Sequence, residues 1–96
     1  MPDTPRRVRF APDTVLQVID GDALILKLQH ETVFSLNETG ARIAELIATG
    51  KTIHEIVETL AAEYDRSRDD LERDVRDLVT ALLSRGLLVA AGEHDG

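Results

Sequence analysis

Several residue types that support particular chemistries are missing or scarce in this chain of 96 residues. There is no cysteine, which excludes disulfides, thiolate metal sites and sulfur nucleophiles and fits a reducing compartment. Aromatic residues make up only 3% of the chain, too few to build the stacking platforms that bind single-stranded nucleic acid. No apolar run is long enough to cross a bilayer, and the N-terminus lacks the apolar stretch of a secretion signal. We therefore expect a cytoplasmic protein without a membrane partner.

Positive charge is also scarce, because 11 Lys and Arg residues stand against 18 Asp and Glu residues and the formal net charge is −7. Most of the acidic excess lies in residues 55–77. This charge opposes a polyphosphate partner, so we expect no nucleic acid partner. The basic residues Arg6, Arg7 and Arg9 cluster in an N-terminal arm, residues 1–12, that we expect to be flexible and solvated.

The first half of the chain has the pattern of a small sheet. Two short apolar runs, Val15–Asp20 and Ala23–Leu28, flank an Asp-Gly-Asp turn, and a third run, Thr32–Leu36, follows a turn at residues 29–31. These runs predict a three-stranded antiparallel meander. Alternation along the strands predicts a buried face made by Leu24, Leu26, Leu28, Phe34 and Leu36, and an outward face with Ile25, Val33 and Ser35.

Three helical patterns follow, and each has its own start signal. Asn37 is the N-cap of the first, which ends near Gly50, and Ser67 begins the third, which stops at Gly86. Thr52 opens the second with a capping-box pattern. The prediction is an α+β fold, a β-β-β sheet followed by three helices that cover one face, within a domain at residues 13–90. The apolar run 87–89 either packs under the helices or adds a strand, and a disordered tail at residues 91–96 follows.

Catalytic constellations are not apparent in the sequence. The three histidines, His30, His54 and His94, do not share a strand or helix face, and there is no nucleophile with a base, no facing carboxylate pair and no phosphate loop. We predict that the chain is not an enzyme and uses no metal or cofactor.

Acidic residues do share one face of the third helix, because Asp70, Asp74 and Asp77 recur at helical spacing. One interpretation is a solubilising face whose charges suit a helix N-terminus. The other is a docking surface for a basic partner.

Two functions fit a small sheet with three helices. A winged-helix transcriptional regulator would place residues 67–85 in the DNA major groove, but the acidic residues there would meet phosphates with repulsion. A peptide-binding module would instead use the edge of strand 32–36, where an extended peptide adds by backbone hydrogen bonds. That edge is open unless the run 87–89 covers it or two copies of the chain pair there as a homodimer.

The order and spacing of several residues resemble the PqqD family, the pyrroloquinoline quinone biosynthesis protein D-like recognition elements of precursor peptides. The resemblance covers residues 13–90 and is carried by Leu36-Asn37-Glu38-Thr39-Gly40-Ala41, Ile43, Leu46, Gly50, Thr52, Glu55-Ile56, Leu60, Tyr64, Asp74-Val75, Leu78, Leu82 and Gly86-Leu87-Leu88. It implies a winged helix-turn-helix-like domain without catalysis of its own. Such a domain binds the leader of a ribosomally synthesised precursor peptide and presents the peptide to a modifying enzyme, which is a radical enzyme, a leader peptidase, a cyclase or a dehydratase.

In this family the leader resembles a fourth strand that lies antiparallel to the third strand and against the third helix. Carried over by position, the resemblance implies a peptide-binding set of Glu31, Thr32, Val33, Phe34, Ser35, Leu36, Asp70, Arg73, Asp74, Asp77, Leu78 and Ala81. The sequence leaves open which border of the third helix faces the strand. Gly40 departs from the family pattern, where Ala is common, and loosens the start of the first helix by up to about 1 kcal/mol.

Overall fold

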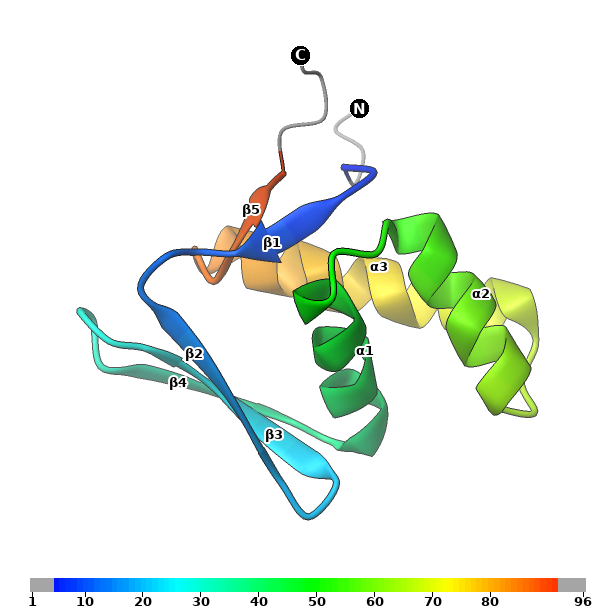
Figure 1. Cartoon of the computed structure of the whole chain (residues 1–96), viewed down its shortest axis with the longest axis horizontal. Helices are drawn as coiled ribbons and strands as arrows, with labels where there is room; N and C mark the ends of the chain where they lie inside the picture. Colours follow the sequence, from blue (N-terminus) through cyan, green and yellow to red (C-terminus); the bar gives the residue numbers. More distant parts are fainter. Residues whose placement is uncertain (1–4, 92–96) are drawn as a thin grey trace.

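The computed structural model describes residues 5–91 (Figure 1). Its elements are, in order, β1 (Val8–Phe10), β2 (Thr14–Ile19), β3 (Asp22–Lys27), β4 (Thr32–Leu36), α1 (Glu38–Ala48), α2 (Ile53–Glu63), α3 (Arg68–Ser84) and β5 (Leu88–Ala90). Strands β2, β3 and β4 form an antiparallel sheet in that order, and β1 pairs with β5 in a separate two-stranded sheet. Helix α1 lies between the larger sheet and α2 (Figure 1). The predicted α+β fold, a β-β-β meander followed by three helices, is confirmed.

The three helices begin where their capping residues predict. The side chain of Asn37 accepts a hydrogen bond from the Gly40 N–H at 2.9 Å, which satisfies one donor of the first turn of α1. Thr52 and Glu55 form both halves of the capping box, with donor to acceptor distances of 3.1 and 2.7 Å. Ser67 caps α3 in the same way as Asn37 caps α1. These local hydrogen bonds are why the helix starts can be predicted from sequence.

One apolar core joins the helices to both sheets. Its fully buried large side chains are Ile25, Ile43, Ile47, Ile56, Leu60, Leu71, Leu82, Leu87 and Leu88. Leucine, isoleucine and valine supply most of this core, as the scarcity of aromatic residues requires. Among residues 5–91, no helix is long and apolar enough to span a bilayer.

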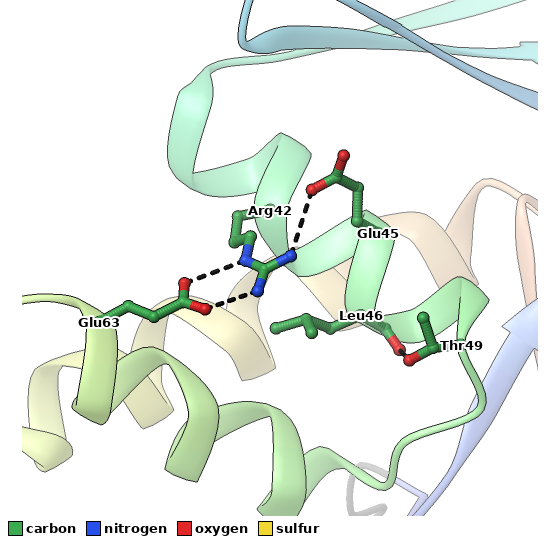
Figure 2. Close-up of polar contacts among 5 residues, drawn as sticks. All are labelled: Arg42, Glu45, Leu46, Thr49 and Glu63. Atoms are coloured by element: carbon green, nitrogen blue, oxygen red, sulfur yellow. Dashed lines mark hydrogen bonds and ion pairs between the residues drawn. The ribbon is translucent and has the colours of Figure 1, made fainter.

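An ion pair joins α1 to the end of α2 (Figure 2). The guanidinium of Arg42 donates to both carboxylate oxygens of Glu63, at 3.0 and 2.5 Å, and to Glu45 at 3.4 Å. Arg42 holds the pKa of Glu63 below its ordinary value of 4.5, because the charged carboxylate gains hydrogen bonds. The hydroxyl of Thr49 donates to the Leu46 carbonyl at 2.7 Å and closes the last turn of α1. The ion pair between Arg42 and Glu63 thus links α1 to α2, whereas the Thr49 hydrogen bond lies within the C-terminal turn of α1.

The two faces of β3 are opposite to the prediction. Ile25, predicted to point outward, is fully buried, whereas Leu28, predicted to be buried, is 61% exposed. Ile25 pairs with Phe34 of β4, so both side chains lie on the face that packs on the helices. Leu24 and Leu26 lie on the opposite face, because successive side chains of a strand point to opposite sides.

Lys27 explains why the two faces were interchanged. Lys27 is on the same face of β3 as Ile25, so the face that is buried contains a charged residue. The leucines of the opposite face give it the more apolar sequence pattern. In the structure the Lys27 ammonium donates to the Asp13 carboxylate at 2.9 Å and to the Gly86 carbonyl at 3.0 Å. These partners keep the charge paired while the apolar part of the side chain is covered. Both partners are distant in sequence, so the alternation alone could not reveal them.

The N-terminal segment also differs from the flexible arm that was expected. Residues 8–10 form β1, which pairs with β5 in the register Val8↔Ala90. Val8 is only 1% exposed, because its side chain points into the core. Arg9, the next residue of the strand, points the other way and is exposed. The run 87–89 thus contributes to an added strand, one of the two placements considered, and it pairs with β1. The predicted tail lies outside the described residues from residue 92 onward.

Candidate functional site

Strand β4 is at one edge of the larger sheet. Within residues 5–91 it pairs with β3 on one side, and no other strand pairs with its second side. The segment considered as a cover for this edge, residues 87–89, lies beside β1 instead. The edge that the sequence proposes for peptide binding is therefore open in the described part of the chain.

The direction of the backbone hydrogen bonds shows which groups are available at this edge. The N–H of Leu28 donates to the carbonyl of Asp13, the residue just before β2, at 2.9 Å. Successive residues of a strand direct their N–H and C=O groups to opposite neighbouring strands. Leu28 bonds toward β2, so Ile25 bonds toward β4, and the N–H and C=O of its partner Phe34 bond back to β3. The N–H and C=O groups of Val33 and Ser35 consequently point to the open edge.

A groove lies beside this edge, with a volume of about 440 Å³. Its walls come from β4, from the first turns of α1 and from α3. The lining residues are Phe34, Ser35, Leu36, Asn37, Thr39, Gly40, Ile43, Asp74, Asp77 and Leu78. The open edge and one flank of α3 thus belong to one concave surface.

The border of α3 that faces β4, which the sequence left open, follows from these contacts. Asp74 and Leu78 line the groove, and Arg85 continues their row at helical spacing. The guanidinium of Arg85 lies 5.0 Å from the centre of the Phe34 ring, within the range of a cation–π contact. Ala81 belongs to the same row by its spacing. The flank that carries Asp74 therefore faces the strand.

Six of the twelve residues in the predicted peptide-binding set line the groove: Phe34, Ser35, Leu36, Asp74, Asp77 and Leu78. The other six are outside its lining. Glu31 lies in the turn before β4 with a φ of 52°, while Thr32 and Val33 begin the strand itself. Asp70 and Arg73 lie near the start of α3, where the Arg73 guanidinium is 3.9 Å from the Asp70 carboxylate.

Sequence reasoning missed the contribution of α1 to the groove. Asn37, Thr39, Gly40 and Ile43 line it because the chain turns from β4 into α1 without a linker. The signal was present, since an N-cap that directly follows a strand must place the first helical turn beside the end of that strand. The first turn of α1 is therefore a wall of the groove.

The groove carries negative charge at one end. Asp74 pairs with Arg66 at 2.8 Å, whereas Asp77 has no basic side chain within ion-pair distance among residues 5–91. Arg85 lies over Phe34, outside the lining of the groove. The described residues contain no group of three potential metal ligands. The groove thus offers an apolar wall, hydrogen-bonding backbone groups and an acidic end.

Comparisons with known proteins agree with this geometry. The family model described as "Coenzyme PQQ synthesis protein D (PqqD)" matches residues 22–88. The structure described as "TbiB1 in Complex with the TbiA(beta) Leader Peptide" is 36% identical, with a TM-score of 0.81, and the match covers 88% of this chain and 99% of that chain.

A second structure, "Lasso peptide synthetase B1 complexed with the leader peptide", is 28% identical with a TM-score of 0.79, and the match covers 86% of this chain and 98% of that chain. No curated protein matches the chain. The alternative of a DNA-binding regulator is not supported by these findings. The family match spans most of the chain, and the predicted resemblance is confirmed: this protein belongs to the PqqD family.

Proposed function

We propose that this protein is a non-catalytic recognition element that binds the leader of a ribosomally synthesised precursor peptide and presents the peptide to a modifying enzyme. The observation that carries the proposal is the groove that joins the open edge of β4 to α3. Both structural neighbours described above are complexes with leader peptides, which supports the same role.

The leader adds to β4 as a further strand. The outward N–H and C=O groups of Val33 and Ser35 supply four backbone hydrogen bonds at most, because each residue has one donor and one acceptor. At roughly 0.5–1.5 kcal/mol each, these bonds contribute about 2–6 kcal/mol in total. A micromolar complex requires about 8 kcal/mol after the cost of association. Side chains of the leader must therefore supply the remainder by entering the groove.

The groove selects among leader side chains by shape and charge. Every second side chain of an added strand points toward α3, where Leu78 and Phe34 offer apolar contact. Asp77 favours a basic or hydrogen-bond-donating group at the same end. We propose that the leader continues past the groove along the rest of the predicted set, which includes Glu31 and Thr32 on one side and Asp70, Arg73 and Ala81 on the helix.

The modifying enzyme acts on the core of the precursor while the leader stays bound. A radical enzyme, a leader peptidase and a cyclase all fit this arrangement, because the recognition element contributes only binding. A homodimer that pairs β4 with β4 would occupy the same edge and compete with the leader. Function in the cytoplasm is consistent with the absence of cysteine.

An NMR titration of the isotopically labelled protein tests the proposal. The probes are the TbiA(beta) leader peptide and the leader half of the precursor encoded beside this chain, each compared with a scrambled peptide of the same composition. We expect amide shifts concentrated in residues 31–36 and 70–81 that saturate at micromolar concentration with at least one leader. Shifts spread over the surface, or equal shifts with the scrambled peptide, would contradict strand addition at β4.

A further inference from the structure

A second hollow, larger than the groove, lies on the opposite flank of α3. Its volume is about 570 Å³, and its walls come from the segment before β1, the start of α2 and the outer face of α3. Arg76 lines it, whereas Asp74 and Leu78 line the groove. Residues two positions apart in a helix point to nearly opposite sides. Ligands in the two hollows would therefore not compete for space.

Arginine dominates this hollow, which we call the arginine hollow. Its charged lining residues are Arg6, Arg7, Arg68 and Arg76, with Glu55 and Glu72. Four arginines against two glutamates leave an excess of positive charge in a chain whose formal net charge is −7. Segments far apart in the sequence bring these cations together, so the cluster is a product of the fold.

The segment that carries Arg6 and Arg7 is held in place by its backbone. The Arg6 carbonyl accepts a hydrogen bond from the Ile53 N–H at 2.8 Å, and the Arg7 carbonyl accepts one from the Ala91 N–H at 2.9 Å. Val8, the next residue, is buried. Both arginine side chains therefore leave a fixed backbone at the edge of the hollow, and little backbone entropy remains to be lost on binding a ligand.

The arginines differ in their existing partners. Arg68 is paired with Glu58, and Arg76 donates to Glu72 at 3.0 Å. No carboxylate of residues 5–91 is within ion-pair distance of Arg6 or Arg7. These two guanidinium groups each keep their donors for a ligand.

The charge around the hollow limits what it binds. A long polyanion would extend beyond the arginines, and the rest of the chain would repel it because the formal net charge is −7. A short segment with a few carboxylates keeps its charge within the hollow and suits the fork of an arginine. We propose that the arginine hollow binds a short Asp- and Glu-rich segment of a protein partner. Leader binding in the groove and this contact are independent.

Fluorescence anisotropy with a labelled hexaglutamate peptide tests this proposal on the full chain. The variants are Arg6→Glu and Arg7→Glu, and the matched control is Arg9→Glu, which makes the same charge change on an exposed residue outside the hollow. We expect at least fivefold weaker binding for the first two and less than a twofold change for the control. Arg7→Gln should give an intermediate loss, because it removes the cation without adding a carboxylate.

Three results would overturn the proposal. These are no binding of hexaglutamate to the parent protein at low salt, an equal loss in Arg9→Glu, and tighter binding of inorganic polyphosphate than of hexaglutamate. Thermal unfolding of each variant controls for folding. Titration with the TbiA(beta) leader peptide is a separate measurement, so failure of leader binding would leave the hexaglutamate result interpretable.

Discussion

The larger sheet has two edges, and they differ in what stands beside them. At the β4 edge, three strand residues share a groove of about 440 Å³ with α1 and α3. At the β2 edge, Val18 lines a hollow of about 170 Å³ with residues of α1, and Ile19 lines one of about 370 Å³. Neither hollow involves a residue of α3. Both edges offer unpaired backbone groups. The β4 edge differs in having a wall formed by α3, and we propose that this wall makes it the edge that selects peptide side chains.

The backbone of the two edges is otherwise comparable. Val18 pairs with Ala23, whose own backbone groups bond toward β4, so the N–H of Val18 points away from the sheet. The N–H of Val33 does the same at the other edge. Both side chains are exposed, at 43% and 58%. The pair therefore allows the same substitution to be compared with and without the wall formed by α3.

Proline substitution at the two edges should give the largest difference. Val33→Pro removes a donor that a leader added to β4 would use, and it should weaken leader binding at least tenfold. Val18→Pro removes an equivalent donor at the other edge and should leave binding unchanged. Isothermal titration calorimetry with a leader that binds the parent protein gives the affinities. Because each N–H faces away from the ladder, both variants should retain the fold, which circular dichroism checks.

A control separates the backbone of Val33 from its side chain. Val33→Ala keeps the N–H and removes most of the exposed side chain, so its affinity should stay within a few-fold of the parent. If Val33→Pro bound the leader as tightly as Val33→Ala, the peptide would not be adding to this edge. Equal losses in Val33→Pro and Val18→Pro would mean that the two edges are equivalent.

The second prediction concerns the side chains of one cross-strand row. Leu16 of β2, Ile25 of β3 and Phe34 of β4 are directly opposite one another. Leu16 and Phe34 are both partly buried against the core, so Leu16→Ala and Phe34→Ala should each lower the free energy of unfolding by about 1–3 kcal/mol. Only Phe34→Ala should also weaken leader binding, by about tenfold, because Phe34 lines the groove. Urea unfolding and calorimetry measure the two effects, and a binding defect in Leu16→Ala would remove the distinction.

Local signals predicted the helical half of the molecule well. Asn37, Thr52 and Ser67 each satisfy a donor in their own first turn, so the information lies within a few residues of the cap. The apolar stripe of α2 needed no tertiary knowledge either, because helical spacing alone brings its buried residues to one face.

Long-range contacts decided the features that the sequence did not predict. The faces of β3 depended on Lys27, whose partners Asp13 and Gly86 are distant in the chain. The site itself was predicted as two separate segments, a strand edge and a helix flank. Their meeting at Leu78, together with the wall formed by Gly40, is a result of packing and required the structure.

The third prediction tests whether the β2 side of the sheet is structural only. The Lys27 ammonium holds the pKa of Asp13 below its ordinary value of 3.8, mainly through their hydrogen bond. A carboxylate with a lowered pKa in the folded state stabilises the fold above the unfolded value, and this contribution is lost as the pH falls below about 3.8. Asp13→Asn should therefore have a lower melting temperature than the parent protein at pH 7. The difference between the two melting temperatures should become smaller at pH 3.

Leader affinity at pH 7 should be the same for Asp13→Asn and the parent, because neither Asp13 nor Lys27 lines the groove. Asp22→Asn is the matched control, since Asp22 is exposed and has no basic side chain within ion-pair distance among residues 5–91. The melting temperature of Asp22→Asn should differ little from that of the parent protein at either pH. A loss of leader affinity in Asp13→Asn would mean that the β2 side also positions the groove.

The smallest effect is expected from Gly40→Ala, which adds one methyl group to the wall formed by α1. The new Cβ would lie 3.2 Å from Cδ2 and 3.3 Å from Cβ of Leu36, closer than ordinary contact. Alanine favours the helix by up to about 1 kcal/mol, and the crowding of Leu36 opposes this gain, so stability should change by less than about 1 kcal/mol.

The methyl group narrows the groove, so leader affinity should fall about two- to threefold while binding of hexaglutamate stays the same. Calorimetry on the parent and the variant measures the change in affinity. An unchanged affinity would mean that the inward side chains of the leader do not reach the first turn of α1. In that case α3 alone would distinguish the β4 edge from the β2 edge.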